Sequence, residues 1–295
     1  MERTRDLVVA SAAFRSSYIP TLIETGGFYV PQDQAKTDET IKRAADRVSR
    51  IEVRGIENLV EAQQLARKYR LTVTGNHTNE WDTVVTKIAL RNVGQKEFGD
   101  RLTYYGGLQI YEREELRMMV GTDNLLYVVS PSDMAEIDEA KAEAEEIGDI
   151  EALFVLATCD GYQRALNNAT KEKSKTLFVP GSQSNICAFY PETEYQRQGG
   201  ITRAPANVSA LFSRRERQEY ILPVMVFGHE EIEGGGKIDL TVLFGKPYDS
   251  VLAWRNRPEG FHAVDLIMGS VASLYPERIN PRQREFYAPV LNLAL

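Results

Sequence analysis

His77 is the residue of this chain whose type and neighbours best suit proton transfer. It stands in the stretch "LTVTGNHTNEWDTVV", residues 71–85, five residues before Asp82. A neutral imidazole takes a proton from a hydroxyl when a carboxylate fixes its tautomer and stabilises the imidazolium. A base of this kind contributes about 10² to 10⁴ in rate. His77 and Asp82 are therefore a candidate catalytic pair.

The same segment is open to two other interpretations. Asn79, followed three residues later by Asp82, resembles a capping box at a helix start, which would give Asp82 a purely structural role. Gly-Asn-His also occurs in metallophosphoesterases, but the other ligands of such a centre are missing from this sequence. His229 and His262 are isolated along the chain, and we expect no metal site.

The elements around His77 must bring its ring to the edge of a sheet. Residues 71–75 are short and rich in β-branched side chains, which predicts a strand, and residues 81–93 carry apolar side chains at helical spacing. A strand–turn–helix unit of this kind presents its turn at the carboxyl edge of a sheet, where open α/β folds bind ligands. Asp82, one turn into the helix, could reach back to His77.

Strand-like and helical segments alternate along much of the chain. Strand-like runs occur at residues 51–55, 71–75, 125–129, 176–179, 221–227 and 238–245, with helical patterns between them. This alternation predicts a mixed α/β fold with a largely central β-sheet flanked by helices. We expect an N-terminal helical segment at 1–50 and an α/β domain at 51–295, with an acidic helical insertion near 131–150.

Composition excludes several classes of protein. The net charge of −7 argues against a nucleic-acid partner. No apolar run approaches the roughly 18 residues that a membrane-spanning helix needs. Cys159 and Cys187 are too few for a disulfide framework. We therefore expect a cytoplasmic protein, with peripheral membrane contact as one option for residues 1–50.

Several blocks of the chain resemble one enzyme family. "NHTNEWD" resembles the Asn-His-x-x-x-x-Asp block of the glycerolipid acyltransferases, the family of glycerol-3-phosphate and 1-acylglycerol-3-phosphate (lysophosphatidic acid) O-acyltransferases. Further blocks follow in the family's order, so that the resemblance spans roughly residues 51–250. They are "IEVRGIENL" (51–59), "GGLQIYER" (106–113), "LFVPGSQSN" (177–185), "ILPVMVFG" (221–228) and "LTVLFGKPYD" (240–249).

The resemblance implies direct acyl transfer from a thioester. The donor would be a fatty acyl group on coenzyme A or on acyl carrier protein, and no further cofactor is implied. His77 would deprotonate the acceptor hydroxyl, which attacks the thioester without a covalent acyl-enzyme, while Asp82 orients His77. Asn76 and backbone amides near the turn are candidate donors to the developing oxyanion. Arg113, the arginine of the second block, would bind the acceptor.

The third block departs from the family pattern of Phe-Pro-Glu-Gly-Thr-Arg-Ser. Gln183 replaces the arginine, which leaves Gly181, Ser182 and Ser184 as substrate contacts. Glutamine cannot reproduce a bidentate phosphate clamp. Charge from Arg113, Arg197 or Arg203 could replace the missing arginine. The acceptor therefore stays open between glycerol 3-phosphate or a lysophospholipid and another hydroxyl or an amine. A non-catalytic relative that binds lipid or acyl carrier protein is the remaining alternative.

Overall fold

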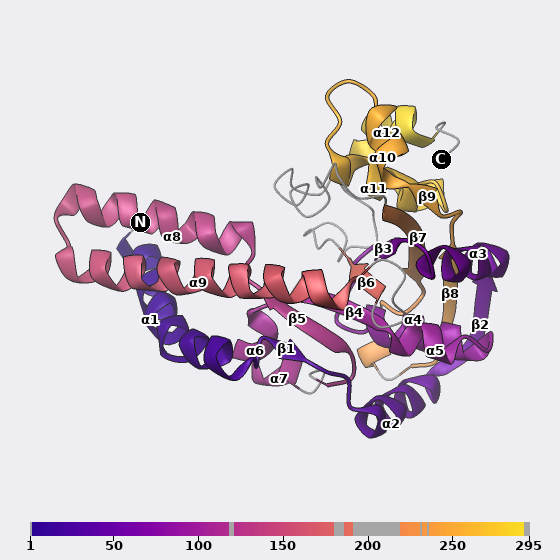
Figure 1. Ribbon diagram of the computed structural model, residues 1–295, viewed down its shortest axis with the longest axis horizontal. Helices are drawn as coiled ribbons and strands as arrows, with labels where there is room; N and C mark the ends of the chain where they lie inside the picture. The colour runs from indigo at the N-terminus through magenta and orange to yellow at the C-terminus, as the bar shows by residue number, and fades with distance from the viewer. Residues whose placement is uncertain are drawn as a thin grey trace. The chain divides into compact units, whose positions relative to one another are not determined.

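The computed structural model describes residues 2–117, 121–179, 186–190, 219–230, 232–234 and 236–291. Within these residues nine strands form one sheet, in the order β1-β5-β4-β6-β3-β7-β8-β2, with β9 paired to β7 (Figure 1). Helices flank this mostly parallel sheet, which confirms the predicted α/β class. The strands are β1 Tyr29–Val30, β2 Val48–Arg54, β3 Arg70–Gly75, β4 Leu102–Gly107, β5 Asn124–Val128, β6 Ile186–Phe189, β7 Glu219–Phe227, β8 Ile238–Phe244 and β9 Tyr248–Asp249.

The helices range from single turns to one of 28 residues. They are α1 Glu2–Thr25, α2 Gln34–Ala45, α3 Ile56–Ala66, α4 Asp82–Asn92, α5 Lys96–Asp100, α6 Gln109–Glu112, α7 Glu114–Arg117, α8 Pro131–Ile147, α9 Ile150–Leu177, α10 Ser250–Arg255, α11 Ala263–Ala272 and α12 Arg284–Leu291. No helix among the described residues is both long enough and apolar enough to cross a bilayer.

The chain divides into two compact units. One, here called the helical unit, comprises Met1–Pro31, Tyr105–Val120 and Leu125–Leu177; the other, the sheet unit, comprises Gln32–Tyr104, Gly121–Asn124 and Phe178–Leu295. This division differs from the predicted boundary at residue 50. The reason is that α1 packs against α8 and α9, whereas the following helix and strand, α2 and β2, belong to the sheet unit.

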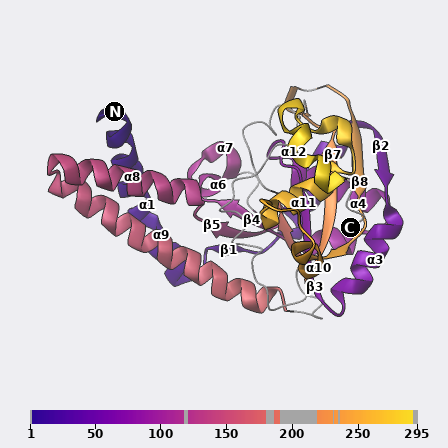
Figure 2. The same ribbon diagram turned by 90° about the horizontal axis from the view of Figure 1, so that it is seen from above.

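In the helical unit, α8 and α9 run side by side (Figures 1 and 2). The predicted acidic helix is confirmed as α8, which begins with a capping box formed by Ser130 and Asp133. The predicted strand at 176–179 is wrong, because Thr176 and Leu177 complete α9. Buried side chains recur every three or four residues along α9, and this period continues through Ser174. The packing of one face of α9 therefore outweighs the β propensity of the residues at its carboxyl end.

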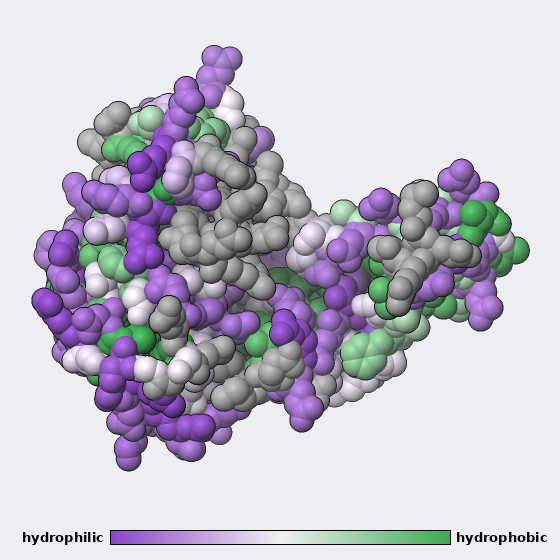
Figure 3. All heavy atoms as spheres, turned by 180° about the vertical axis from the view of Figure 1, so that it is seen from behind, coloured by the Kyte–Doolittle hydropathy of each residue, from purple (hydrophilic) through white to green (hydrophobic). Residues whose placement is uncertain are grey.

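Large apolar side chains are exposed around the turn between α8 and α9. Ile147, Ile150 and Phe154 are 58–79% exposed, and hydrophobic atoms are visible at that end of the helical unit in Figure 3. Beneath this surface, small and aliphatic side chains of α1, α8 and α9 form a packed core.

In the sheet unit, β3 lies between two parallel neighbours, β6 and β7. Parallel strands end at the same edge, so the segments that follow β3 and β7 meet in space. Pro223 lies within β7 at the point where its antiparallel partner changes from β9 to β8, and Gly245 donates its backbone N–H to the Pro223 carbonyl (2.8 Å). The strands predicted at 51–55, 71–75, 221–227 and 238–245 are confirmed. No clear pattern of residues predicts β4 or β6.

Candidate active site

The turn that follows β3 is tied to β7 through the side chain of Asn76. Asn76 Oδ1 accepts the backbone N–H of Val226 (2.8 Å), and its Nδ2 donates to the Val226 carbonyl (2.7 Å) and to Thr78 Oγ1 (3.2 Å). These bonds extend the β3–β7 ladder by one residue through a side chain. Both amide hydrogens are engaged, so Asn76 holds the turn and its side chain is not available as an oxyanion donor. Backbone amides remain the candidates for that role.

His77 and Asp82 form the hydrogen-bonded pair that the sequence predicts. His77 Nδ1 lies 2.5 Å from Asp82 Oδ2. A carboxylate only accepts hydrogen bonds, so Nδ1 carries the hydrogen and Nε2 is the basic nitrogen of the neutral ring. The His77 side chain is 27% exposed, whereas that of Asp82 is fully buried. The ring thus joins a partly open surface to a buried negative charge.

A second histidine binds the same carboxylate. His229 Nε2 donates to Asp82 Oδ1, and its ring is fully buried. Thr78 adds its backbone N–H to Oδ2 at 2.7 Å. His229 is isolated along the sequence, but the prediction that it is isolated in the structure is wrong. His229 follows β7 just as His77 follows β3, and the two strands are parallel neighbours. Two histidines two residues beyond two strand ends are the signal that could have revealed this contact.

The surroundings of Asp82 keep it ionised. Burial works to raise its pKa, but hydrogen bonds from His229 and His77 outweigh burial and hold the pKa below its usual range. Asp82 also begins α4, where the helix dipole favours negative charge. Asn79, not Asp82, accepts the backbone N–H of Trp81 (2.9 Å) at this helix start. The geometry therefore supports the orienting role of Asp82 over the capping role.

Gly228 allows His229 to reach Asp82. Its φ of +90° lies in the left-handed region, and a Cβ at this position would lie 2.0 Å from the carbonyl oxygen of Asp239. Only glycine fits such a backbone. Gly228 also donates its N–H to Glu230 (2.8 Å), which pairs with Arg278 (3.1 Å). The segment after β7 is thus fixed at the position that determines where His229 points.

A buried polar cluster holds the next turn of α4. Lys87 is 1% exposed, and its Nζ lies 2.6 Å from Asp123 Oδ1. Thr83 Oγ1 donates to Asp123 Oδ2 (2.7 Å). Thr86, on the same helix, lies 3.3 Å from the hydroxyl of Tyr190. These contacts anchor α4 and so fix the position of Asp82 at its first turn.

The remaining predicted site residues are Arg113, Gly181, Ser182 and Ser184, together with the possible substitutes Arg197 and Arg203. Arg113 ends α6 in the helical unit and is exposed. Gly181, Ser182 and Ser184 lie outside the described residues, as do Arg197 and Arg203. Their predicted roles stay predictions. In the described part of the chain, no group of three or more His, Cys, Asp or Glu side chains could hold a metal ion.

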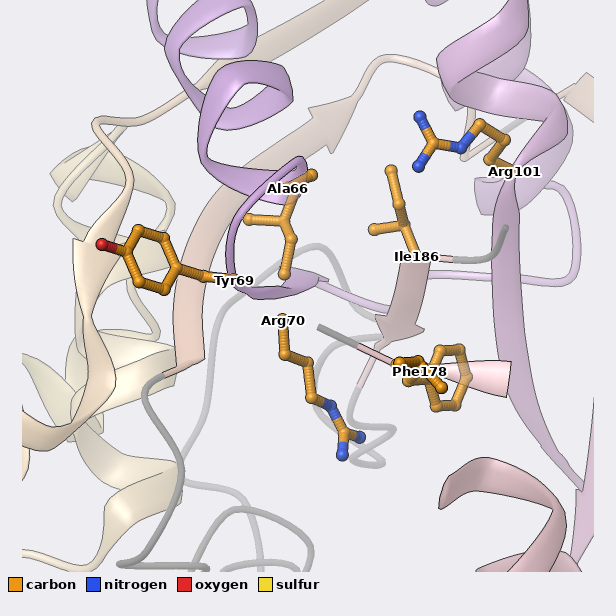
Figure 4. Close-up of a pocket in the computed structure, with 8 residues that line it drawn as sticks. Ala66, Tyr69, Arg70, Arg101, Phe178 and Ile186 are labelled. Atoms are coloured by element: carbon orange, nitrogen blue, oxygen red, sulfur yellow. The ribbon is translucent and has the colours of Figure 1, made fainter. Parts of the chain in front are cut away.

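A small pocket lies at the amino ends of β3 and β6, whereas His77 follows the carboxyl end of β3. Its lining residues are Ala66, Tyr69, Arg70, Leu71, Arg101, Phe178, Val179 and Ile186. Arg70 lies over the Phe178 ring and beside Glu219. Figure 4 shows that the guanidinium groups of Arg70 and Arg101 do not point toward a common place. The pocket therefore lacks converging groups for an anion, and the His77 edge is the better candidate site.

Neither the models of known protein families nor the curated proteins give a match to this chain.

Proposed function

We propose that this protein is an O-acyltransferase that moves a fatty acyl group from a thioester of coenzyme A or acyl carrier protein to a hydroxyl. The observation that carries the proposal is the 2.5 Å contact between His77 Nδ1 and the buried Asp82 carboxylate. This pair has the arrangement of a base with its orienting group, and it lies at the carboxyl edge of a mostly parallel sheet, where ligands bind in such folds.

The resemblance implies a direct reaction, and the hydrogen-bonded pair fits the base that such a reaction needs. His77 Nε2 takes the proton of the acceptor hydroxyl as its oxygen attacks the thioester carbonyl. The C–O bond forms, the tetrahedral intermediate collapses with cleavage of the C–S bond, and the proton passes from His77 to the leaving thiol. Asp82 holds Nδ1–H throughout and stabilises the charged ring. Cys159 and Cys187 are both buried, and this mechanism uses neither as a nucleophile.

Glycerol 3-phosphate or a lysophospholipid is the acceptor that the resemblance of the blocks favours. Gln183, where the family has an arginine, favours the second candidate, in which another hydroxyl or an amine takes the acyl group. The hydrogen-bonded pair supports an enzyme over a non-catalytic lipid or carrier-protein binder, because a binder needs no buried carboxylate behind a histidine. Membrane contact would be peripheral, at the surface that supplies lipid substrates.

The test supplies palmitoyl-coenzyme A or palmitoyl-acyl carrier protein with one acceptor at a time. Glycerol 3-phosphate, lysophosphatidic acid, unphosphorylated glycerol and a primary amine are compared, and mass spectrometry identifies the acylated product. We expect an ester product that disappears in His77→Ala and persists in the control His262→Ala. If glycerol 3-phosphate and lysophosphatidic acid neither react nor inhibit, the phosphorylated acceptor is refuted. If no acceptor gains an acyl group, the enzyme proposal fails.

A further inference from the structure

We infer that His229 is a positioning residue that holds Asp82 in the orientation His77 requires. The inference rests on the proposed function for its catalytic meaning, but its structural content can be tested without activity. His229 does not contact the reacting atoms and acts through the carboxylate alone.

The two histidine rings bind different oxygens of the Asp82 carboxylate. His77 binds Oδ2 through Nδ1, and His229 binds Oδ1 through Nε2. The terminal torsion of an aspartate is broad, so donors that meet at one oxygen, here His77 and Thr78 at Oδ2, restrain the carboxylate plane less than donors at both oxygens. Donors on separate oxygens fix the carboxylate plane. His229 thereby determines the direction from which Asp82 accepts the Nδ1–H of His77.

The two histidines differ in burial. Its ring is fully buried, whereas the His77 ring is 27% exposed, so His77 is the histidine that a substrate can reach. Among the described residues, the Nδ1 atom of His229 meets no hydrogen-bond partner. An apolar side chain would fill the same space without burying an unpaired polar atom. In the described structure, this ring makes one polar contact, which is with Asp82. That contact explains why residue 229 is a histidine and not an apolar residue.

Glutamine and phenylalanine separate the hydrogen bond from the shape of the ring. His229→Gln keeps an N–H that can reach Asp82, whereas His229→Phe keeps a planar ring and removes the donor. His262→Phe is the matched control, because His262 precedes α11 and takes no part in the hydrogen bonds described at Asp82. The chain has three histidines. The ring signals that disappear in the His229 and His262 variants assign those two residues, and the remaining signals belong to His77.

The first measurement is NMR of the full chain labelled with 15N-histidine. We expect downfield ring N–H protons from His77 and His229, because both rings donate to a buried carboxylate. In His229→Phe the His77 proton should weaken through exchange with water, and in His229→Gln it should stay. An unchanged His77 proton in His229→Phe overturns the inference. If His229→Phe does not fold, loss of the His77 proton in folded His229→Gln overturns it as well.

The second measurement is steady-state acyl transfer. In metal sites, removing a group that orients a ligand typically costs about 10-fold to 100-fold in affinity or activity, and we take the same range for a group that orients the partner of a base. We expect a loss of this size in kcat for His229→Phe, with KM for the thioester within about twofold, and recovery of most of kcat in His229→Gln. Equal losses in the two variants would reduce His229 to a packing residue and overturn the inference. If the wild-type protein transfers no acyl group, the proposed function fails while the NMR result still decides the positioning role.

Discussion

Replacing Asp82 by asparagine separates an orienting carboxylate from a helix cap. Asp82 is fully buried, and N–H groups of His77, Thr78 and His229 converge on its two oxygens. Asparagine has the same shape but offers one oxygen, and its NH₂ group must occupy the place of the other. If the NH₂ group takes the place of Oδ2, it faces the N–H groups of His77 and Thr78; if it takes the place of Oδ1, it faces the N–H of His229. In either case a donor meets a donor.

The expected cost follows from these contacts. A buried donor left without its acceptor costs about 1–3 kcal/mol, and the bonds that survive lose their charge assistance. We therefore expect Asp82→Asn to lower the free energy of unfolding by about 2–4 kcal/mol. Loss of a cap alone would cost about 1 kcal/mol. The rate of acyl transfer should fall by about 10³ to 10⁴, because His77 loses the partner that selects its tautomer.

Two assays measure the effect: urea unfolding followed by circular dichroism, and the initial rate of thiol release from palmitoyl-coenzyme A. Asp265→Asn is the matched control. Asp265 is also buried at a helix start, but its Oδ2 accepts the backbone N–H of His262 (2.7 Å), as a cap does. If Asp82→Asn loses no more stability than Asp265→Asn and retains the wild-type rate, Asp82 does not orient His77.

Three further predictions follow from the same structure. Gly228→Ala places a Cβ 2.0 Å from the Asp239 carbonyl oxygen at a residue with positive φ. The free energy of unfolding should therefore fall by more than about 1 kcal/mol, and kcat should fall as in His229→Phe. A wild-type kcat would contradict the role of this turn. Because the pKa of Asp82 is lowered in the fold, its stabilisation is complete above the unfolded value of about 3.9 and is lost as pH falls through the lowered folded value. Below about pH 5, the free energy of unfolding measured in urea should therefore fall more steeply with pH in the wild-type protein than in Asp82→Asn. If the free energies of the two proteins fall in parallel, the prediction is wrong. Burial raises the pKa of Cys187 to about 11. Iodoacetamide at pH 9 should therefore leave Cys187 unmodified in the native protein and alkylate it in urea, which peptide mass spectrometry can measure. Rapid labelling of the native protein would show that the thiol is accessible to the reagent.

The strands and helices that could be predicted from sequence are those with a strong period or a clear boundary. β3 and α4 follow from a β-branched run, a glycine turn and an apolar helical face. α9 could not be delimited, because its last residues have β propensity while its burial continues a helical period. The two units could not be predicted either, since the packing of α1 against α8 and α9 joins segments far apart in sequence.

The candidate site could be predicted only in its local part. His77 and Asp82 lie on one strand–turn–helix unit, so their spacing indicated the contact as one of two local interpretations, beside a helix cap. His229 is 147 positions from Asp82, and its contact depends on β7 lying parallel beside β3. Neighbouring strands are chosen by the packing of the whole sheet, which no local pattern encodes. Asn76 was predicted as a substrate contact, but the backbone of Val226 takes both ends of its amide.

The central claim is that His77 is the base of an acyl transfer, and one rate comparison tests it most directly. Thiol release from palmitoyl-coenzyme A is followed in the presence of the acceptor that yields product, for the wild-type protein and for His77→Gln. Glutamine can still accept a bond and fill the space, but it cannot act as a base. We predict a fall in kcat of about 10² to 10⁴ with the fold unchanged by circular dichroism. Equal turnover in the two proteins would contradict the account.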